Sequence, residues 1–158
     1  MRIIGIDPGT AIVGFSILEE KDGEVTLLDY GCIRTATGLA QGIRLNQIAE
    51  DLTTLVKKWK PQKASIESLF FSKNVKTAMS VAEARGVILQ VLEKHGIEQE
   101  EYTPPQIKSA VCGNGRADKK AVQEMTKMLL NLDKIPTPDD AADAIAAAIC
   151  SANTLKIQ

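Results

Sequence analysis

Apolar residues recur with two different periods along this chain. Near the start of the sequence they form three segments of strand length, at residues 2–7, 12–19 and 24–34. Pro-Gly and Asp-Gly sequences separate these segments, and such dipeptides are typical of tight turns between neighbouring strands. The pattern therefore predicts three consecutive strands that pair as an antiparallel meander.

From residue 40 onward the apolar period is mostly that of a helix. Apolar residues three or four positions apart predict a helix at 40–59, which Pro61 ends. The later segments alternate between strand length and helix length, although the one at 98–102 is a weak strand pattern. We expect strands at 63–67 and 98–102, and helices at 75–94, 104–111, 119–131 and 139–153.

This order of elements predicts an α/β fold. Three strands are followed by helix, strand, helix, strand and three helices, which favours a mixed five-stranded sheet flanked by helices. Three strands of the sheet are expected to be antiparallel and the later two to be parallel additions. With 158 residues and neither an internal repeat nor a long linker, the chain is expected to form one domain, residues 1–158.

The composition is that of an ordinary soluble protein. Hydrophobic residues make up 44% and charged residues 25% of the chain. The sequence contains neither an apolar run of membrane-spanning length nor a signal-peptide pattern, so we expect a cytoplasmic protein without membrane contact. Three cysteines, an odd number without close pairing in sequence, favour reduced thiols over a zinc site.

Charge is distributed unevenly along the chain. The net charge is −1, but residues 57–127 contain 13 Lys or Arg and 8 Asp or Glu, whereas the flanking segments are acidic. A basic middle segment is typical of a protein with a phosphate-binding face, although a chance distribution explains it equally well.

Carboxylates end two predicted strands and begin the last helix. Asp7 ends the first strand, Glu67 ends the fourth, and Asp140 and Asp143 share one face of the helix at 139–153. Each has an ordinary structural explanation when taken singly, as a turn residue or a helix-dipole partner. Carboxylates gathered at the edge of a core, however, resist ionisation unless a cation neutralises them, and oxygen ligands suit Mg²⁺ or Mn²⁺. Two such ions about 4 Å apart can drive phosphodiester hydrolysis.

Four motifs then occur in a recognisable order. They are Gly5-Ile6-Asp7-Pro8-Gly9-Thr10, Ile66-Glu67 followed by Phe70 and Lys73-Asn74, Ala84-Arg85-Gly86, and Asp140-Ala141-Ala142-Asp143-Ala144. In this combination the chain resembles, over nearly its whole length, the RuvC-type Holliday-junction resolvases of bacteria. The resemblance implies a ribonuclease H-like fold.

The resemblance also implies a function and a set of metal ligands. Such resolvases are homodimers that bind four-way DNA junctions and nick two strands of like polarity symmetrically, in homologous recombination and DNA repair. Asp7, Glu67, Asp140 and Asp143 match the residues that hold two Mg²⁺ ions, for which Mn²⁺ is expected to substitute. Some members have His where this chain has Asp140. A branch-migration helicase is the expected protein partner.

The resemblance extends to residues that contact DNA. Lys108 and Lys119 match basic residues on either side of a glycine-rich turn, and Phe70 matches an aromatic residue near the crossover. Read from the residues alone, lysines on this turn suit either phosphate contact or a solvated surface, and loop aromatics are more typical of a small apolar cluster. The predicted DNA-binding residues are Phe70, Lys73, Lys108, Arg116, Lys119 and Lys120.

The helix at 75–94 is the expected dimer contact. It carries two apolar lines, and one helix cannot turn both toward its own sheet, so one line is left for a partner unless the helix at 40–59 covers it. One line contains Val75, Met79, Ala82 and Gly86, and the other contains Val81, Ala84, Ile88, Leu89 and Leu92.

Two other functions remain open at this point. The chain could be another nuclease of the ribonuclease H fold that acts on an RNA–DNA hybrid, or a junction-binding dimer without catalysis. A nucleotide-binding module of the actin or sugar-kinase type is excluded, because such proteins need two domains and this chain has room for one.

Overall fold

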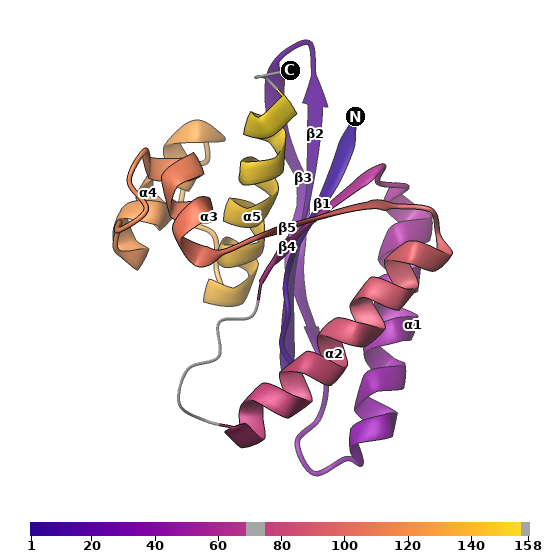
Figure 1. Ribbon diagram of the computed structural model, residues 1–158. Helices are drawn as coiled ribbons and strands as arrows, with labels where there is room; N and C mark the ends of the chain where they lie inside the picture. Colours follow the sequence, from indigo (N-terminus) through magenta and orange to yellow (C-terminus); the bar gives the residue numbers. More distant parts are fainter. Residues whose placement is uncertain (69–74, 156–158) are drawn as a thin grey trace.

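The protein forms a five-stranded mixed sheet with helices on both faces, as Figure 1 shows. The computed structural model describes residues 1–68 and 75–155. The strand order across the sheet is β3-β2-β1-β4-β5. The strands are β1 (Arg2–Asp7), β2 (Ile12–Lys21), β3 (Glu24–Arg34), β4 (Lys63–Glu67) and β5 (Glu98–Tyr102).

The pairing directions confirm the predicted mixed sheet. β2 is antiparallel to both β1 and β3, whereas β4 is parallel to both β1 and β5. At the turn between β2 and β3, Asp22 and Gly23 both have positive φ angles, of 54° and 85°. Two successive residues of this kind match the right-handed twist of the strands that they join.

The helices lie in two layers on opposite faces of the sheet. Helices α1 (Gln41–Trp59) and α2 (Val75–Lys94) cover one face, and α5 (Asp139–Leu155) covers the other (Figure 1). Outside α5 lie α3 (Pro104–Cys112) and α4 (Lys119–Leu129). Within the described residues, no helix combines the length and apolar character needed to cross a membrane.

Local signals explain most of the helix ends. Thr103 and Gln106 form a capping box at the start of α3, and the Asp118 carboxylate accepts a hydrogen bond from the Ala121 amide at 2.8 Å at the start of α4. The predicted end of α4 at residue 131 is two residues too late. Asn131 has a φ of +50°, a left-handed conformation that cannot continue a helix.

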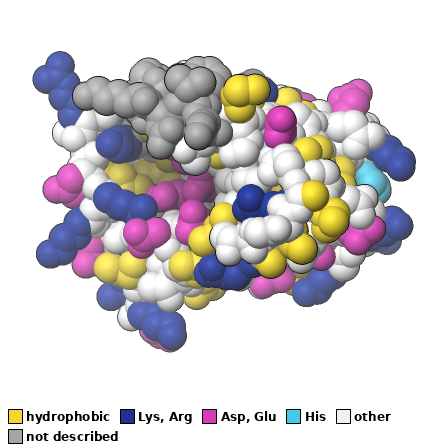
Figure 2. Space-filling model, turned by 90° about the horizontal axis from the view of Figure 1, so that it is seen from below, with side chains coloured by type: hydrophobic (Ala, Val, Ile, Leu, Met, Phe, Trp, Pro, Cys, Tyr) yellow, Lys and Arg dark blue, Asp and Glu magenta, His cyan; other side chains and the backbone are white. Residues whose placement is uncertain are grey.

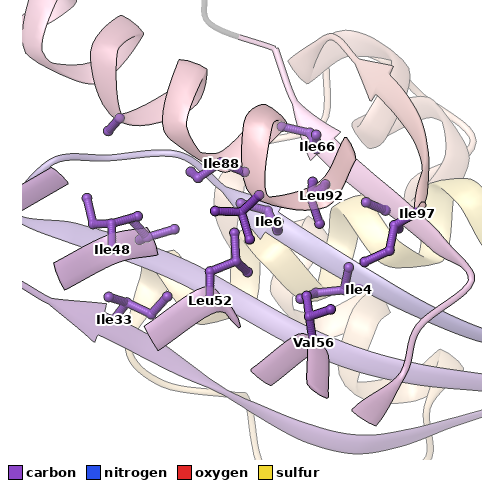
Figure 3. Packing of buried hydrophobic residues seen from close by; sticks show 14 of the residues in the cluster. Ile4, Ile6, Ile33, Ile48, Leu52, Val56, Ile66, Ile88, Leu92 and Ile97 are labelled. Atoms are coloured by element: carbon purple, nitrogen blue, oxygen red, sulfur yellow. The ribbon is translucent and has the colours of Figure 1, made fainter. Parts of the chain in front are cut away.

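Large aliphatic side chains fill the space between the sheet and α1 and α2. Every second residue of the central strands points to this face, where it meets one stripe of each helix (Figure 3). The predicted stripe of α1 is confirmed. The labelled core residues are Ile4, Ile6, Ile33, Ile48, Leu52, Val56, Ile66, Ile88, Leu92 and Ile97.

The opposite face packs differently, because α5 lies almost directly on the strand backbones. Its alanines leave little between helix and sheet, and the closest approach is over glycines and serines of the central strands, with Ile3 and Leu18 packed in the same layer. A Cβ atom added to Gly5 would lie 2.0 Å from the carbonyl oxygen of Ala144, and one added to Gly14 would lie 1.9 Å from that of Asp140. Only glycine fits at these two positions while α5 stays in place.

Candidate active site

The four predicted carboxylates meet at one end of the sheet, where two parallel strands end and the last helix begins. β1 and β4 are parallel neighbours, so Asp7 and Glu67 come at the same edge, and α5 begins there with Asp140 and Asp143. Asp7 lies two residues after Gly5, so its side chain shares the α5 face of β1 with that glycine.

The charges of the four carboxylates act on one another. Burial, followed by the charges of Glu67, Asp143 and Asp140, raises the pKa of Asp7 to about 8. Burial and the charge of Asp143 raise the pKa of Glu67 to about 7, and burial also raises the pKa of Asp143. This end of the sheet therefore holds more negative charge than it can keep ionised at neutral pH.

A lysine from α4 partly neutralises this charge. The Lys119 ammonium lies 3.1 Å from the Asp143 carboxylate and 3.1 Å from that of Asp139. Although burial lowers the pKa of Lys119, its hydrogen bonds to these two carboxylates raise it above the usual value. Asp139 also accepts from the Gln123 amide, so it turns toward α4, whereas the charge of Asp140 acts on Asp7.

The carboxylates and lysines line a shared hollow. A cavity of about 220 Å³ is bounded by Glu67, Asp143, Lys108 and Lys119, with apolar residues of α3, α4 and α5 behind them. Figure 2 views this end of the molecule, where acidic side chains gather in a hollow with basic side chains around it. A larger cavity, of about 570 Å³, lies between the β2–β3 turn and the ends of α4 and α5, away from the carboxylates.

The donor set fits a divalent cation chemically. Carboxylate oxygens are the ligands that Mg²⁺ and Mn²⁺ prefer, and a cation would offset the repulsion that raises the pKa of Asp7. Across residues 1–68 and 75–155, however, no three Asp, Glu, His or Cys side chains are close enough together to hold one ion as they stand. The carboxylates would have to draw together to hold an ion.

The family of this chain follows from comparison with known proteins. A family model described as the crossover junction endodeoxyribonuclease RuvC matches residues 3–151. The chain belongs to the RuvC family. This is a family of metal-dependent nucleases, and the predicted resemblance is confirmed.

Individual RuvC proteins agree with this chain over nearly its whole length. The RuvC of Brevibacillus brevis is 49% identical over 152 residues, which cover 96% of this chain and 92% of that protein. The RuvC of Thermosipho melanesiensis is 51% identical, covering 96% and 97%. The structure of T. thermophilus RuvC in complex with Holliday junction substrate is similar with a TM-score of 0.94 and 28% identity, covering 99% of this chain and 96% of that one. The ribonuclease H-like fold is therefore also confirmed.

The residues predicted to contact DNA fall into three groups in this RuvC-family chain. Lys108 and Lys119 line the cavity beside the carboxylates. Arg116 and Lys120 are exposed and lie outside the lining of that cavity. The other two, Phe70 and Lys73, lie outside the described residues.

Sequence reasoning missed two features of the site. The pairing of Lys119 with Asp139 and Asp143 joins α4 to α5, and their spacing in the sequence carries no sign of it. The hydroxyl groups of Ser16 and Ser65 bond to the backbone of α5, although each occupies a strand position where an apolar residue is usual. For Ser65 the available signal was a serine in a buried strand two residues before the predicted ligand Glu67; Ser16 precedes no carboxylate in this way.

Proposed function

We propose that this chain cuts four-way DNA junctions by paired, symmetric nicks in strands of like polarity, with Mg²⁺ ions held by Asp7, Glu67, Asp140 and Asp143. The observation that carries the proposal is the gathering of these carboxylates at one end of the sheet, where the pKa of Asp7 rises to about 8. The similarity to T. thermophilus RuvC, whose structure contains Holliday junction substrate, supports the junction as substrate.

The side chains of this end of the sheet have complementary roles in the proposal. Bound Mg²⁺ would supply the positive charge that activates a water and stabilises the leaving oxygen of a phosphodiester. Lys108 and Lys119 share a cavity with Glu67 and Asp143, so a phosphate held by their ammonium groups would lie beside the carboxylates. The wall behind them is apolar and includes Ile107.

Cleavage of a synthetic four-way junction tests this function. We expect paired nicks in Mg²⁺ or Mn²⁺ and none in EDTA, and slower or no cleavage of an RNA–DNA hybrid. Asp7→Asn should lower cleavage roughly 100-fold or more while junction binding persists, because it removes charge from the metal site and leaves the rest of the surface unchanged. The matched control is Asp51→Asn, on the exposed side of α1, which should cut normally.

Three results would contradict the proposal. Cleavage by Asp7→Asn at the normal rate would remove Asp7 from the site. Preferential cutting of the hybrid would indicate a different nuclease of the same fold. Tight junction binding without cleavage in any divalent metal would indicate a non-catalytic junction-binding protein.

The proposal includes a symmetric dimer formed through α2. Ala84, Ile88 and Leu92 are buried against the sheet, whereas Met79 is 65% exposed. Ala82 and Gly86 are also exposed on the line that contains Met79, and α1 leaves this line uncovered. Such an outward apolar line suits contact with a second copy, whose active site would face the equivalent strand of a two-fold symmetric junction.

Sedimentation of charged variants tests the dimer. Met79→Arg should give a folded monomer that no longer nicks the two strands together. Met128→Arg is the matched control, because Met128 is 71% exposed on α4, and this variant should remain dimeric. A wild-type monomer that nicks in symmetric pairs at the assay concentration would contradict the dimer.

The setting of the reaction is also part of the proposal. The activity serves homologous recombination and DNA repair in a bacterial cytoplasm, beside a branch-migration helicase. Similarity to bacterial RuvC proteins supports this setting. Retention of the wild-type chain, but not of an unrelated protein of equal net charge, by a junction loaded with such a helicase would test it.

A further inference from the structure

We propose that Ser16, Gly5 and Ser65 fix the position of α5 along the sheet and thereby set the spacing between its carboxylates and those of β1 and β4. These three residues are called the seating row below. Ser16 and Ser65 are then positioning residues of the nuclease site, so this inference rests on the proposed function and extends it.

The seating row crosses the three central strands side by side. In the sheet register, Gly5 of β1 pairs with Ser16 of β2 on one side and with Ser65 of β4 on the other. Both serines are 0% exposed. Because Gly5 has no side chain, α5 comes so close that an added Cβ atom would lie 2.0 Å from the Ala144 oxygen. The helix backbone therefore lies directly on this row.

The two serine hydroxyls bond to the backbone of α5. The Ser16 hydroxyl donates to the carbonyl oxygen of Ala144 at 3.0 Å, and the Ser65 hydroxyl donates to that of Ala147. These acceptors are three residues apart, so they point from the same side of the helix. Alanine methyl groups pack without direction and allow sliding, whereas two directed bonds from strands on either side of Gly5 resist both sliding and rotation.

The seating row lies one side-chain repeat away from the carboxylates. Asp7 is two residues beyond Gly5 and Glu67 two beyond Ser65, a step of about 6.6 Å along each strand on the same face. On the helix, Asp143 immediately precedes Ala144, whose carbonyl the seating row holds. A slip of α5 by one residue would move Asp143 by about 1.5 Å and turn it by about 100°. Such a shift is large for a site whose groups must converge.

This role can be separated from a contribution to stability. The acceptor carbonyls lie inside α5, where the helix already supplies them with a hydrogen bond. Replacing the serines by alanine therefore leaves neither an unpaired donor nor an unpaired acceptor, and the cost in stability should be small. A purely structural hydroxyl would change stability first, whereas a positioning hydroxyl would change the response to metal first.

The double variant Ser16→Ala/Ser65→Ala tests the inference. We expect its Mg²⁺ requirement for half-maximal junction cleavage to rise roughly tenfold, its single-turnover rate at saturating Mg²⁺ to fall roughly tenfold, and its Mn²⁺ affinity, measured by electron paramagnetic resonance, to weaken. Junction affinity in EDTA and the urea midpoint should stay close to wild type. The control is Thr126→Val, which removes a buried α4 hydroxyl that has no partner among the described residues.

The outcomes distinguish the two proposals. A wild-type protein that fails to cut junctions in Mg²⁺ refutes the proposed function. If the wild-type protein cuts and the double variant matches it in rate and Mg²⁺ requirement, only the role of the seating row is refuted. If the double variant loses cleavage only in proportion to a lower urea midpoint, the serines are structural. That result would also overturn the inference.

Discussion

The two faces of the sheet are built on opposite principles. On the α1 and α2 face, large aliphatic side chains keep the helices well away from the strands, with Ile88 and Leu52 fully or almost fully buried between them. On the α5 face, glycine and serine bring the helix backbone onto the strand backbone. The residues of the proposed metal site lie on the second face alone.

The two kinds of packing differ in how firmly they fix the position of a helix on the sheet. A layer of long side chains can partly absorb a change of one methylene by adjusting rotamers. A backbone-to-backbone contact has no such freedom, so it holds two elements in one relative position. Both faces bury apolar side chains, but the carboxylates lie on the face where helix backbone contacts strand backbone and where the relative position of the elements is least able to change.

The largest expected contrast comes from changing one carbon on each face. Gly5→Ala adds a methyl that would lie 2.0 Å from the Ala144 carbonyl oxygen, which cannot move unless α5 shifts. We therefore expect a loss of about 3 kcal/mol of unfolding free energy and cleavage lowered roughly 100-fold. Ile88→Val removes one carbon from the other face and should cost about 1 kcal/mol with normal cleavage. Urea unfolding and junction cleavage of both variants check this. Equal effects on cleavage would erase the distinction between the faces.

The pH dependence of stability should be set by the α5 face. Because the pKa of Asp7 rises from 3.8 to about 8 on folding, the folded state binds this proton more tightly than the unfolded state does. In metal-free buffer its contribution to stability is therefore present below pH 4 and is lost as the pH rises toward 8. Glu67, with a pKa raised to about 7, acts in the same direction.

Asp7→Asn removes the larger part of this dependence. At pH 8 in EDTA the variant should be more stable than wild type by roughly 2 kcal/mol, and its stability should fall less between pH 4 and pH 8. Thermal unfolding across this range measures the effect, with Asp51→Asn on the other side of the molecule as the control. Superimposable pH curves for wild type and Asp7→Asn would show that the burial of this charge is unimportant.

The smallest stability effect is expected at the lysine that bridges α4 and α5. Lys119→Ala should lower cleavage roughly tenfold or more but change unfolding free energy by less than about 1 kcal/mol, because its ion pairs are half exposed. Lys120→Ala, one residue along, should weaken junction binding and its salt dependence while leaving the rate of the bound complex unchanged. If Lys119→Ala and Lys120→Ala lowered junction binding and cleavage rate equally, Lys119 would act only through DNA affinity.

Most of the fold could be predicted because it depends on local patterns. All ten described elements were expected, nine of them from apolar periodicity and turn residues, whereas β5 has a weak signal because four of its five residues are Glu or Gln. Parallel strand ends brought Asp7 and Glu67 together. What the sequence could not reveal are contacts between distant segments. The pairing of Arg85 with Glu101, and that of Lys119 with Asp143, depend on how elements pack after they form.

The outward apolar line of α2 is a second example of a feature that the sequence alone could not predict. Periodicity found both apolar lines of the helix but could not say which one faces the sheet, because that choice depends on how α2 meets α1. The close approach of α5 to Gly5 and Gly14 was equally hidden. A glycine in a strand has several explanations, and only the packed helix decides among them.

Asp7 and Glu67 lie far from Asp140 and Asp143 in the sequence, and this distance has a consequence for synthesis of the chain on the ribosome. β1 leaves the ribosome first and α5 last of the described elements, so a nascent chain that ends before Asp139 has Asp7 and Glu67 but lacks their partners. The glycine and serine row stays uncovered until that helix docks. With the metal site as proposed, an unfinished chain would be without nuclease activity, and the ability to cut DNA would appear only with the last step of folding.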